Sequence, residues 1–165
     1  MERAAWPMGA HHPMAQPVAM EATARPISQR ILLAIDQAGS SRAASDEAIR
    51  LAAREGAVLI VLTVLEAHNL HLPGGRFRRI DQERDRLTAG AIAIVRRARA
   101  AGVRATYLIW EGDPAEAILE ASHAERADVI VLGSRPRTNL RRLILGSVSS
   151  EVSRQAPCEV VVVPA

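Results

Sequence analysis

The amino-acid sequence predicts a single α/β domain in which a five-stranded parallel sheet carries helices on both faces. After residue 30 come five short runs that are rich in Leu or β-branched residues and apolar at consecutive positions. Such runs are typical of strands that are buried on both faces. Helical segments separate them, and right-handed crossovers between parallel strands then give a doubly wound sheet. The length of 165 residues is enough for one domain with a sizeable core.

The chain begins with residues 1–29, which we expect to be a disordered tail. Prolines interrupt this segment four times, and no helical or strand-like hydrophobic period survives between them. The predicted domain, residues 30–165, starts with the strand Ile31–Ile35. A helix over 41–55 follows. Its predicted inward face consists of Ala44, Ala48, Leu51 and Ala52.

The second strand, Val58–Leu65, leads through a long loop to a second helix over 80–101. The loop, Ala67–Arg79, contains a Pro-Gly-Gly sequence at 73–75. Because loops of this length are uncommon in compact domains, we interpret it as a flap over a ligand crevice. The inward face of the second helix is predicted to be Leu87, Ala91, Ile94 and Ala98.

The second half of the domain repeats the alternation of strand and helix. The sequence Asp-Pro-Ala-Glu at 113–116 is a helix start signal, with Asp as the N-cap, Pro in the first turn and Glu reaching back. Gly146 and Ser147 open the last helix, and Pro157 closes it. The three predicted strands in this half are Ala105–Trp110, Val129–Leu132 and Val160–Val163.

Composition limits the classes of function. The apolar runs are only strand-length, so the sequence predicts no membrane span, and it shows no secretory signal. One cysteine, Cys158, cannot form an intrachain disulfide, and we expect a cytoplasmic location. The pI of 10.3 looks strongly basic, although the net charge is only +3. The pI is high because the chain has no lysine, so almost no group titrates between His and Arg. A nucleic-acid partner is therefore not indicated.

Two Gly-Ser pairs flank a basic segment after the fourth predicted strand, and together they indicate an anion site. Gly133 follows a strand and lets a ligand approach the backbone. Gly146 and Ser147 offer unpaired N–H groups and the positive end of a helix dipole. A phosphate is the natural ligand, although the absence of lysine excludes a Walker A loop. The basic segment contains Arg135, Arg137, Arg141 and Arg142.

Four sequence motifs resemble the universal stress protein family over residues 29–165. They are Ile31–Asp36, Gly133–Arg135, Leu145–Ser149 and Ala156–Cys158, the last preceding a Val-rich strand. The resemblance implies a Rossmann-like fold, similar to that of adenine-nucleotide α-hydrolase-like proteins. It also implies ATP as ligand, with Mg²⁺ as a possible companion, and a homodimer that pairs its last strands, Val160–Val163. Such pairing would cover an exposed sheet edge. The signalling partner is unknown, and no membrane association is expected.

The resemblance also implies roles for individual residues. Asp36 would face the adenosine near Ala34, and Val64 would contact the adenine through its backbone. Leu132 and Gly133 would line the ribose and phosphate side. The start of the last helix would hold the phosphates. The complete set of predicted nucleotide contacts is Ala34, Asp36, Val64, Leu132, Gly133, Arg135, Gly146, Ser147, Val148 and Ser149.

One departure from the family's ATP-binding motif leaves alternatives open. The second glycine of that motif is Pro136 here, which has no N–H to donate. Loss of one neutral hydrogen bond costs about 1 kcal/mol, or about fivefold in affinity. One hypothesis is an ATP-binding signalling homodimer, and another is a dimeric interaction module with an impaired pocket. A third hypothesis is an enzyme, but no catalytic residue in the sequence supports it. We therefore predict that the protein is not an enzyme, with slow ATP hydrolysis left open.

Simpler interpretations stand beside these roles. Asp36 could cap the turn that follows its strand, and Ser147 and Ser149 could be ordinary helix caps. His68 and His71 have a spacing that could hold a metal ion, but no third ligand lies nearby, and we predict no metal site.

Overall fold

The computed structural model describes residues 29–36, 40–66, 76–134 and 146–164. Over these ranges five strands alternate with four helices. The strands are β1 (Arg30–Ile35), β2 (Val58–Leu65), β3 (Arg104–Glu111), β4 (Val129–Ser134) and β5 (Glu159–Pro164). The helices are α1 (Ser40–Glu55), α2 (Arg76–Ala100), α3 (Pro114–Ala124) and α4 (Ser147–Gln155). None of the helices in these ranges is long and apolar enough to cross a membrane.

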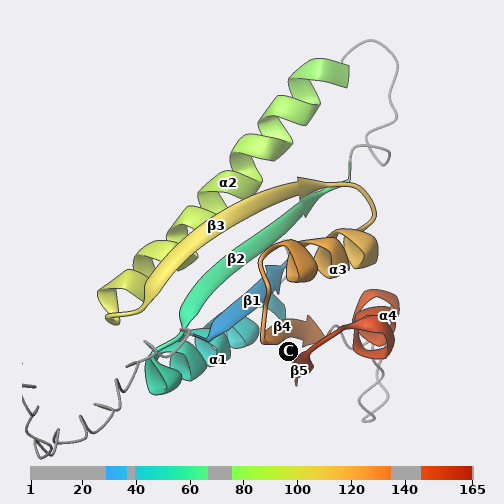
Figure 1. Ribbon diagram of the computed structural model, residues 1–165. Coiled ribbons are helices and arrows are strands. Elements are labelled where there is room, and N and C mark those ends of the chain that lie inside the picture. Colours follow the sequence, from blue (N-terminus) through green and yellow to red (C-terminus); the bar gives the residue numbers. More distant parts are fainter. Residues whose placement is uncertain (1–28, 37–39, 67–75, 135–145, 165) are drawn as a thin grey trace, which may run out of the picture.

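The strands form one parallel sheet with the order β3-β2-β1-β4-β5. Helices α1 and α2 cover one face, and α3 and α4 cover the other (Figure 1). The predicted doubly wound sheet with helices on both faces is therefore confirmed. The chain first builds β1, β2 and β3 in one direction and then crosses to β4 on the other side of β1, so the strand order reverses between β1 and β4.

Two apolar clusters, one on each face of the sheet, form the core. Successive side chains of a strand point to opposite faces, so Ile31 and Leu33 join the α1–α2 cluster while Leu32 joins the α3–α4 cluster. All three side chains are fully buried. The inward faces predicted for α1 and α2 are also confirmed, because Ala48 and Ala91 have no exposed surface.

The start of α3 follows the predicted signal. Asp113 is the N-cap, with an extended backbone, and its carboxylate accepts hydrogen bonds from the N–H groups of Ala115 and Glu116 at 2.9 and 3.2 Å. Pro114 occupies the first helical position, where a missing N–H has no cost. This arrangement is fixed by local sequence, which is why it could be predicted.

Two predicted boundaries are wrong. Helix α2 begins at Arg76, so the last four residues of the predicted loop Ala67–Arg79 are helical. Arginine is a good helix former, and this basic run continues the helix rather than the loop. Strand β4 continues through Gly133 and Ser134, two residues beyond the predicted end, because both pair with β5.

The prediction that every strand is buried on both faces is also wrong, because it fails for the two edge strands. In β3, Thr106 and Tyr107 are exposed, and most residues of β5 are only half-buried. The amide N–H of Gly112 donates to the carbonyl of Leu65, so alternate residues of β3 face β2 and Ala105 faces outward. The outward Ala105 carbonyl accepts hydrogen bonds from the guanidinium of Arg99, at 3.1 and 2.8 Å.

Candidate functional site

The strand reversal between β1 and β4 is where a doubly wound sheet binds its ligand, beyond the carboxyl ends of the strands. Asp36 follows β1 directly and is half-buried. In the sheet register, Ala34 lies between Leu132 of β4 and Leu62 of β2. The structure thus brings Asp36, Ala34 and Leu132 to the same end of adjacent strands, as the sequence predicted.

The predicted nucleotide contacts at the carboxyl ends of the strands differ in what they can offer to a ligand. Leu132 is only 3% exposed and belongs to the α3–α4 cluster, so its side chain is part of the core and only its backbone could meet a ligand. Ala34 and Val64 are partly buried and pack against the same cluster, so both lie on the α3–α4 face. Gly133, one residue beyond Leu132, is half-buried.

Helix α4 presents its N-terminus to the same end of the sheet. The helix connects the carboxyl end of β4 to the amino end of the parallel strand β5, so it runs opposite to both strands. It packs against β4, β5 and α3. The first N–H groups of a helix have no partner within it, so those of Ser147, Val148 and Ser149 are directed towards this edge.

The start of α4 has no side-chain cap among the described residues. Gly146 is the N-cap, with φ −63° and ψ 165°, and as a glycine it supplies no capping side chain of its own. The hydroxyl of Ser149 donates to the Gly146 carbonyl at 3.1 Å instead. The N-cap residue is thus Gly146 rather than Ser147 or Ser149. Among the described residues, a Cβ atom on Gly146 would meet only the Ser149 Oγ, at 3.7 Å.

Several predicted features lie outside the described residues. These include Arg135, Pro136 and the rest of the basic segment, the beginning of the predicted flap, the predicted tail, and His68 and His71. The phosphate contact predicted for Arg135 and the effect of Pro136 therefore remain predictions.

Two ionisable groups among the described residues offer little acid–base or nucleophilic chemistry: Asp113 near the site, and Cys158 at the opposite, amino end of the sheet. The carboxylate of Asp113 is engaged as a helix cap. Burial, followed by the nearby charges of Asp128 and Glu159, raises the pKa of the Cys158 thiol, which disfavours the nucleophilic thiolate. Over the part of the chain that the structure describes, no group of three His, Cys, Asp or Glu side chains could hold a metal ion.

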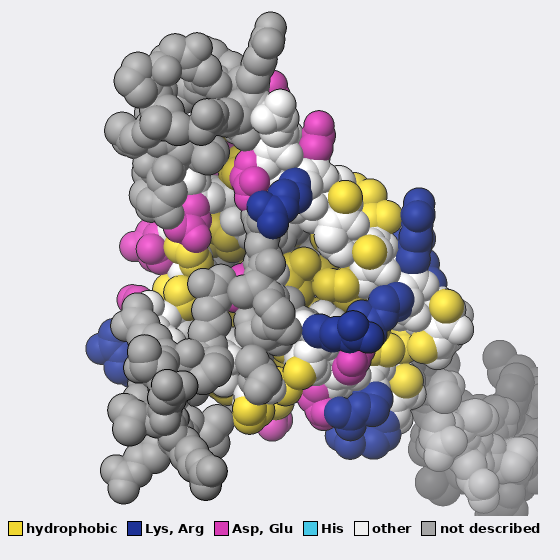
Figure 2. All heavy atoms as spheres, turned by 180° about the vertical axis from the view of Figure 1, so that it is seen from behind, with side chains coloured by type: hydrophobic (Ala, Val, Ile, Leu, Met, Phe, Trp, Pro, Cys, Tyr) yellow, Lys and Arg dark blue, Asp and Glu magenta, His cyan; other side chains and the backbone are white. Residues whose placement is uncertain are grey.

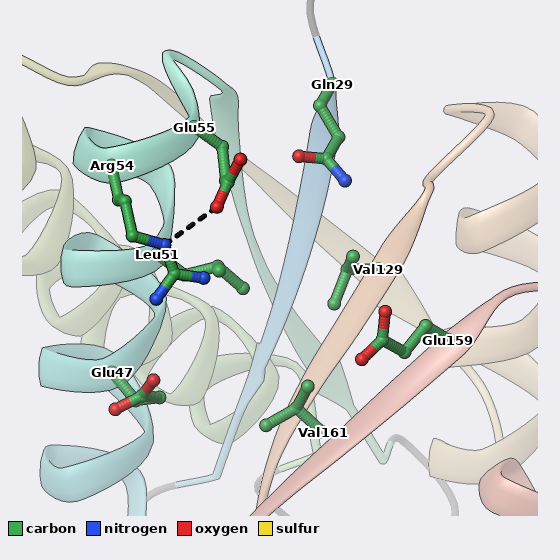
Figure 3. Close-up of a pocket in the computed structure, with 8 residues that line it drawn as sticks. All are labelled: Gln29, Glu47, Leu51, Arg54, Glu55, Val129, Glu159 and Val161. Atoms are coloured by element: carbon green, nitrogen blue, oxygen red, sulfur yellow. Dashed lines mark hydrogen bonds and ion pairs between the residues drawn. The ribbon is translucent and has the colours of Figure 1, made fainter.

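A hollow of about 350 Å³ lies elsewhere, between α1 and the amino ends of β4 and β5 (Figure 3). Arg54 and Glu55 in its wall form an ion pair with each other. Sequence reasoning did not find this hollow, because its walls come from segments far apart in the chain. Its position at the amino ends separates it from the predicted nucleotide site. The lining residues are Gln29, Glu47, Leu51, Arg54, Glu55, Val129, Glu159 and Val161.

Charges on the reverse side of the molecule are mixed. Figure 2 shows dark blue arginine and magenta acidic side chains interspersed over this face. Arginine 97 of α2 forms an ion pair with Asp46 of α1, and Arg50 pairs with Glu47 within α1. Exposed ion pairs of this kind contribute little to stability, but their opposite charges largely cancel at these positions.

One residue that the sequence analysis did not single out lies beside the predicted contacts. Trp110 is the register partner of Val64 in β3, and it packs against the same α3–α4 cluster. It is only partly buried. The sequence places a Trp at the end of a predicted strand, but which residues lie beside it depends on the strand order.

Comparisons with known proteins agree with this architecture. The sequence model described as the universal stress protein family matches residues 28–164. A universal stress protein of Thermus aquaticus is 37% identical over 139 residues, which are 81% of this chain and 96% of that protein. The structure of UspA from Lactobacillus plantarum is 27% identical, with a TM-score of 0.67, over 82% of this chain and 97% of that one.

A further similar structure contains a ligand. A universal stress protein from Archaeoglobus fulgidus, solved in complex with dAMP, has a TM-score of 0.62 and covers 82% of this chain and 98% of its own. Its sequence is 21% identical, a level at which the likeness concerns the fold.

Proposed function

The chain belongs to the universal stress protein family, and on that premise we propose that it is a cytoplasmic homodimer that binds ATP and signals the bound state to a partner. The observation that carries the proposal is the N-terminus of α4, which has no side-chain cap among the described residues. It lies at the same end of the sheet as the carboxyl ends of β1 and β4, where the strand order reverses. Free helical N–H groups at such a point suit a phosphate group.

The sheet end supplies the rest of the site. The Asp36 carboxylate and the backbone near Ala34 would face the ribose, and Val64 would contact the base. The carbonyl and N–H groups near Gly133 would lie beside the phosphates, with Gly146, Ser147, Val148 and Ser149 beyond them. The complex of dAMP with a protein of the same fold supports an adenine nucleotide as ligand.

The proposal includes no catalysed reaction. The Asp113 carboxylate caps α3, and the proposal gives Asp36 a binding role rather than that of a general base. Any Mg²⁺ would arrive with the ATP phosphates, because the described residues provide no group of three metal-binding side chains. The homodimer would form along β5, whose outer edge has no strand partner within the described chain.

The test is a calorimetric titration of the full chain with ATP and Mg²⁺, with GTP and AMP as controls. Saturable ATP binding well below millimolar concentration, with weaker binding of GTP, is the expected result. Absence of heat from a folded dimer at millimolar ATP would reject the proposal.

A second candidate, an interaction module with an impaired pocket, is favoured by Pro136 alone. Proline removes one N–H from the phosphate loop, and it restricts the residue before it. The variant Pro136→Gly separates the two functions. A large gain in ATP affinity would indicate that the native pocket is impaired, whereas an unchanged affinity would favour ATP binding by the native chain.

A further inference from the structure

We propose that the indole of Trp110 is the stacking platform for the nucleotide base, at the end of the site opposite to α4. The inference rests on the proposed function, because it adds a residue to the same site. Trp110 is the penultimate residue of β3, and the sheet register pairs it with Val64. Val64 is the residue at which the base is expected.

The orientation of Trp110 supports this role. Its side chain packs against the α3–α4 cluster together with Val64 and Ala34, so all three lie on one face of the sheet. Trp110 is partly rather than fully buried, so the core does not enclose the residue completely. Tyr107 of the same strand is paired with Val61, a residue of the opposite cluster, and it therefore serves as an aromatic on the other face.

The spacing of the strands also fits. Three steps separate β4, on which α4 packs, from β3. At about 4.8 Å a step, they add up to roughly 14 Å across the end of the sheet. A nucleotide with its phosphates at α4 must extend across β1 and β2 to bring its base to Val64, and the next strand then presents Trp110.

A stacking role makes a specific energetic prediction. Removal of an aromatic ring that stacks on a base weakens binding by about 5- to 150-fold. The loss should affect ligands that contain a base and spare inorganic tripolyphosphate, which has only the phosphate part. A side chain that merely stabilises the sheet would weaken both ligands equally.

The experiment uses the full chain with Trp6→Phe, which removes the only other tryptophan and leaves Trp110 as the sole source of tryptophan fluorescence. Addition of ATP should change the emission of Trp110, and tripolyphosphate should change it little. The variant Trp110→Leu should lower ATP affinity by 5- to 150-fold without changing tripolyphosphate binding. Trp110→Phe should retain most of the ATP affinity, and Tyr107→Leu is the matched control on the opposite face.

The outcomes separate the two proposals. Unchanged emission, together with ATP binding that is the same in wild type and Trp110→Leu, would overturn the stacking role and leave ATP binding intact. Equal losses of ATP and tripolyphosphate would overturn it as well. If Trp110→Leu does not fold, the emission change and the Trp110→Phe affinity decide. Failure of the wild type to bind ATP at all would reject the proposed function itself.

Discussion

Replacement of Gly146 by aspartate should stabilise the domain and abolish ATP binding. Gly146 is the N-cap of α4, with an extended backbone and no side-chain cap. Asp113 occupies the same position in α3, with φ −71° and ψ 135°, and accepts hydrogen bonds from the second and third helical N–H groups. An aspartate at position 146 should therefore bond the N–H groups of Val148 and Ser149, which the phosphates would otherwise use.

The expected effects on stability and on ATP affinity differ in size and in direction. Aspartate is a better N-cap than glycine by a few tenths of a kcal/mol, and its charge at a helix N-terminus adds about 0.3–1 kcal/mol. The sum, about 0.5–1.3 kcal/mol, should raise Tm by about 1–5 °C. A carboxylate about 4 Å from a phosphate charge costs about 4 kcal/mol at an effective dielectric constant of 20. This cost is close to a thousandfold in Kd.

Thermal unfolding followed by circular dichroism and an ATP titration of the same sample measure both effects. Gly146→Ala is the control, because its Cβ would be in ordinary contact with the Ser149 Oγ at 3.7 Å and adds neither a capping group nor a charge. A Gly146→Asp protein less stable than wild type would show that the cap geometry is misjudged. A stabilised variant with unchanged ATP affinity would refute the placement of phosphates at α4.

Two further predictions concern stability and thiol reactivity. Gly90→Ala should raise the free energy of unfolding by about 1 kcal/mol, because Gly90 is an exposed helical residue with open space around it. Gly56→Ala should lower the free energy of unfolding by about the same amount, because Gly56 has a φ of 63°. Urea titrations measure both changes. The raised pKa of Cys158 should make its alkylation slower in the native protein than in the unfolded chain at pH 8, and Glu159→Gln should accelerate the native reaction. Since the unfolded thiol ionises first, this group should also reduce stability as pH rises through its unfolded pKa; a native rate equal to the unfolded one would contradict the assigned burial.

Much of the fold could be predicted because its signals are local. Consecutive apolar residues marked each strand, and the Asp-Pro start at 113 fixed the beginning of α3. The predicted arrangement of Ala34 and Leu132 at one sheet end follows from parallel strands alone, since their carboxyl ends meet at the same edge.

The features that escaped prediction depend on contacts between distant segments. The run Val160–Val163 has the composition of a strand buried on both faces, and that composition does not reveal that these side chains are only half-buried. The hydroxyl of Ser149 turns to the Gly146 carbonyl, a choice that residue type does not reveal. The position of Trp110 beside Val64 results from the pairing of β3 with β2, and no local sequence pattern predicts that pairing.

The two edges of the sheet are not equivalent, and this difference sets a limit on assembly. On β3 the guanidinium of Arg99 occupies the outward carbonyl of Ala105, so a strand that approached this side would have to displace a charged donor. On β5 the outer edge has no such obstacle among the described contacts. If the proposed dimer forms along β5, only this side would be extended, and assembly would stop at a closed pair, since a filament needs two complementary ends.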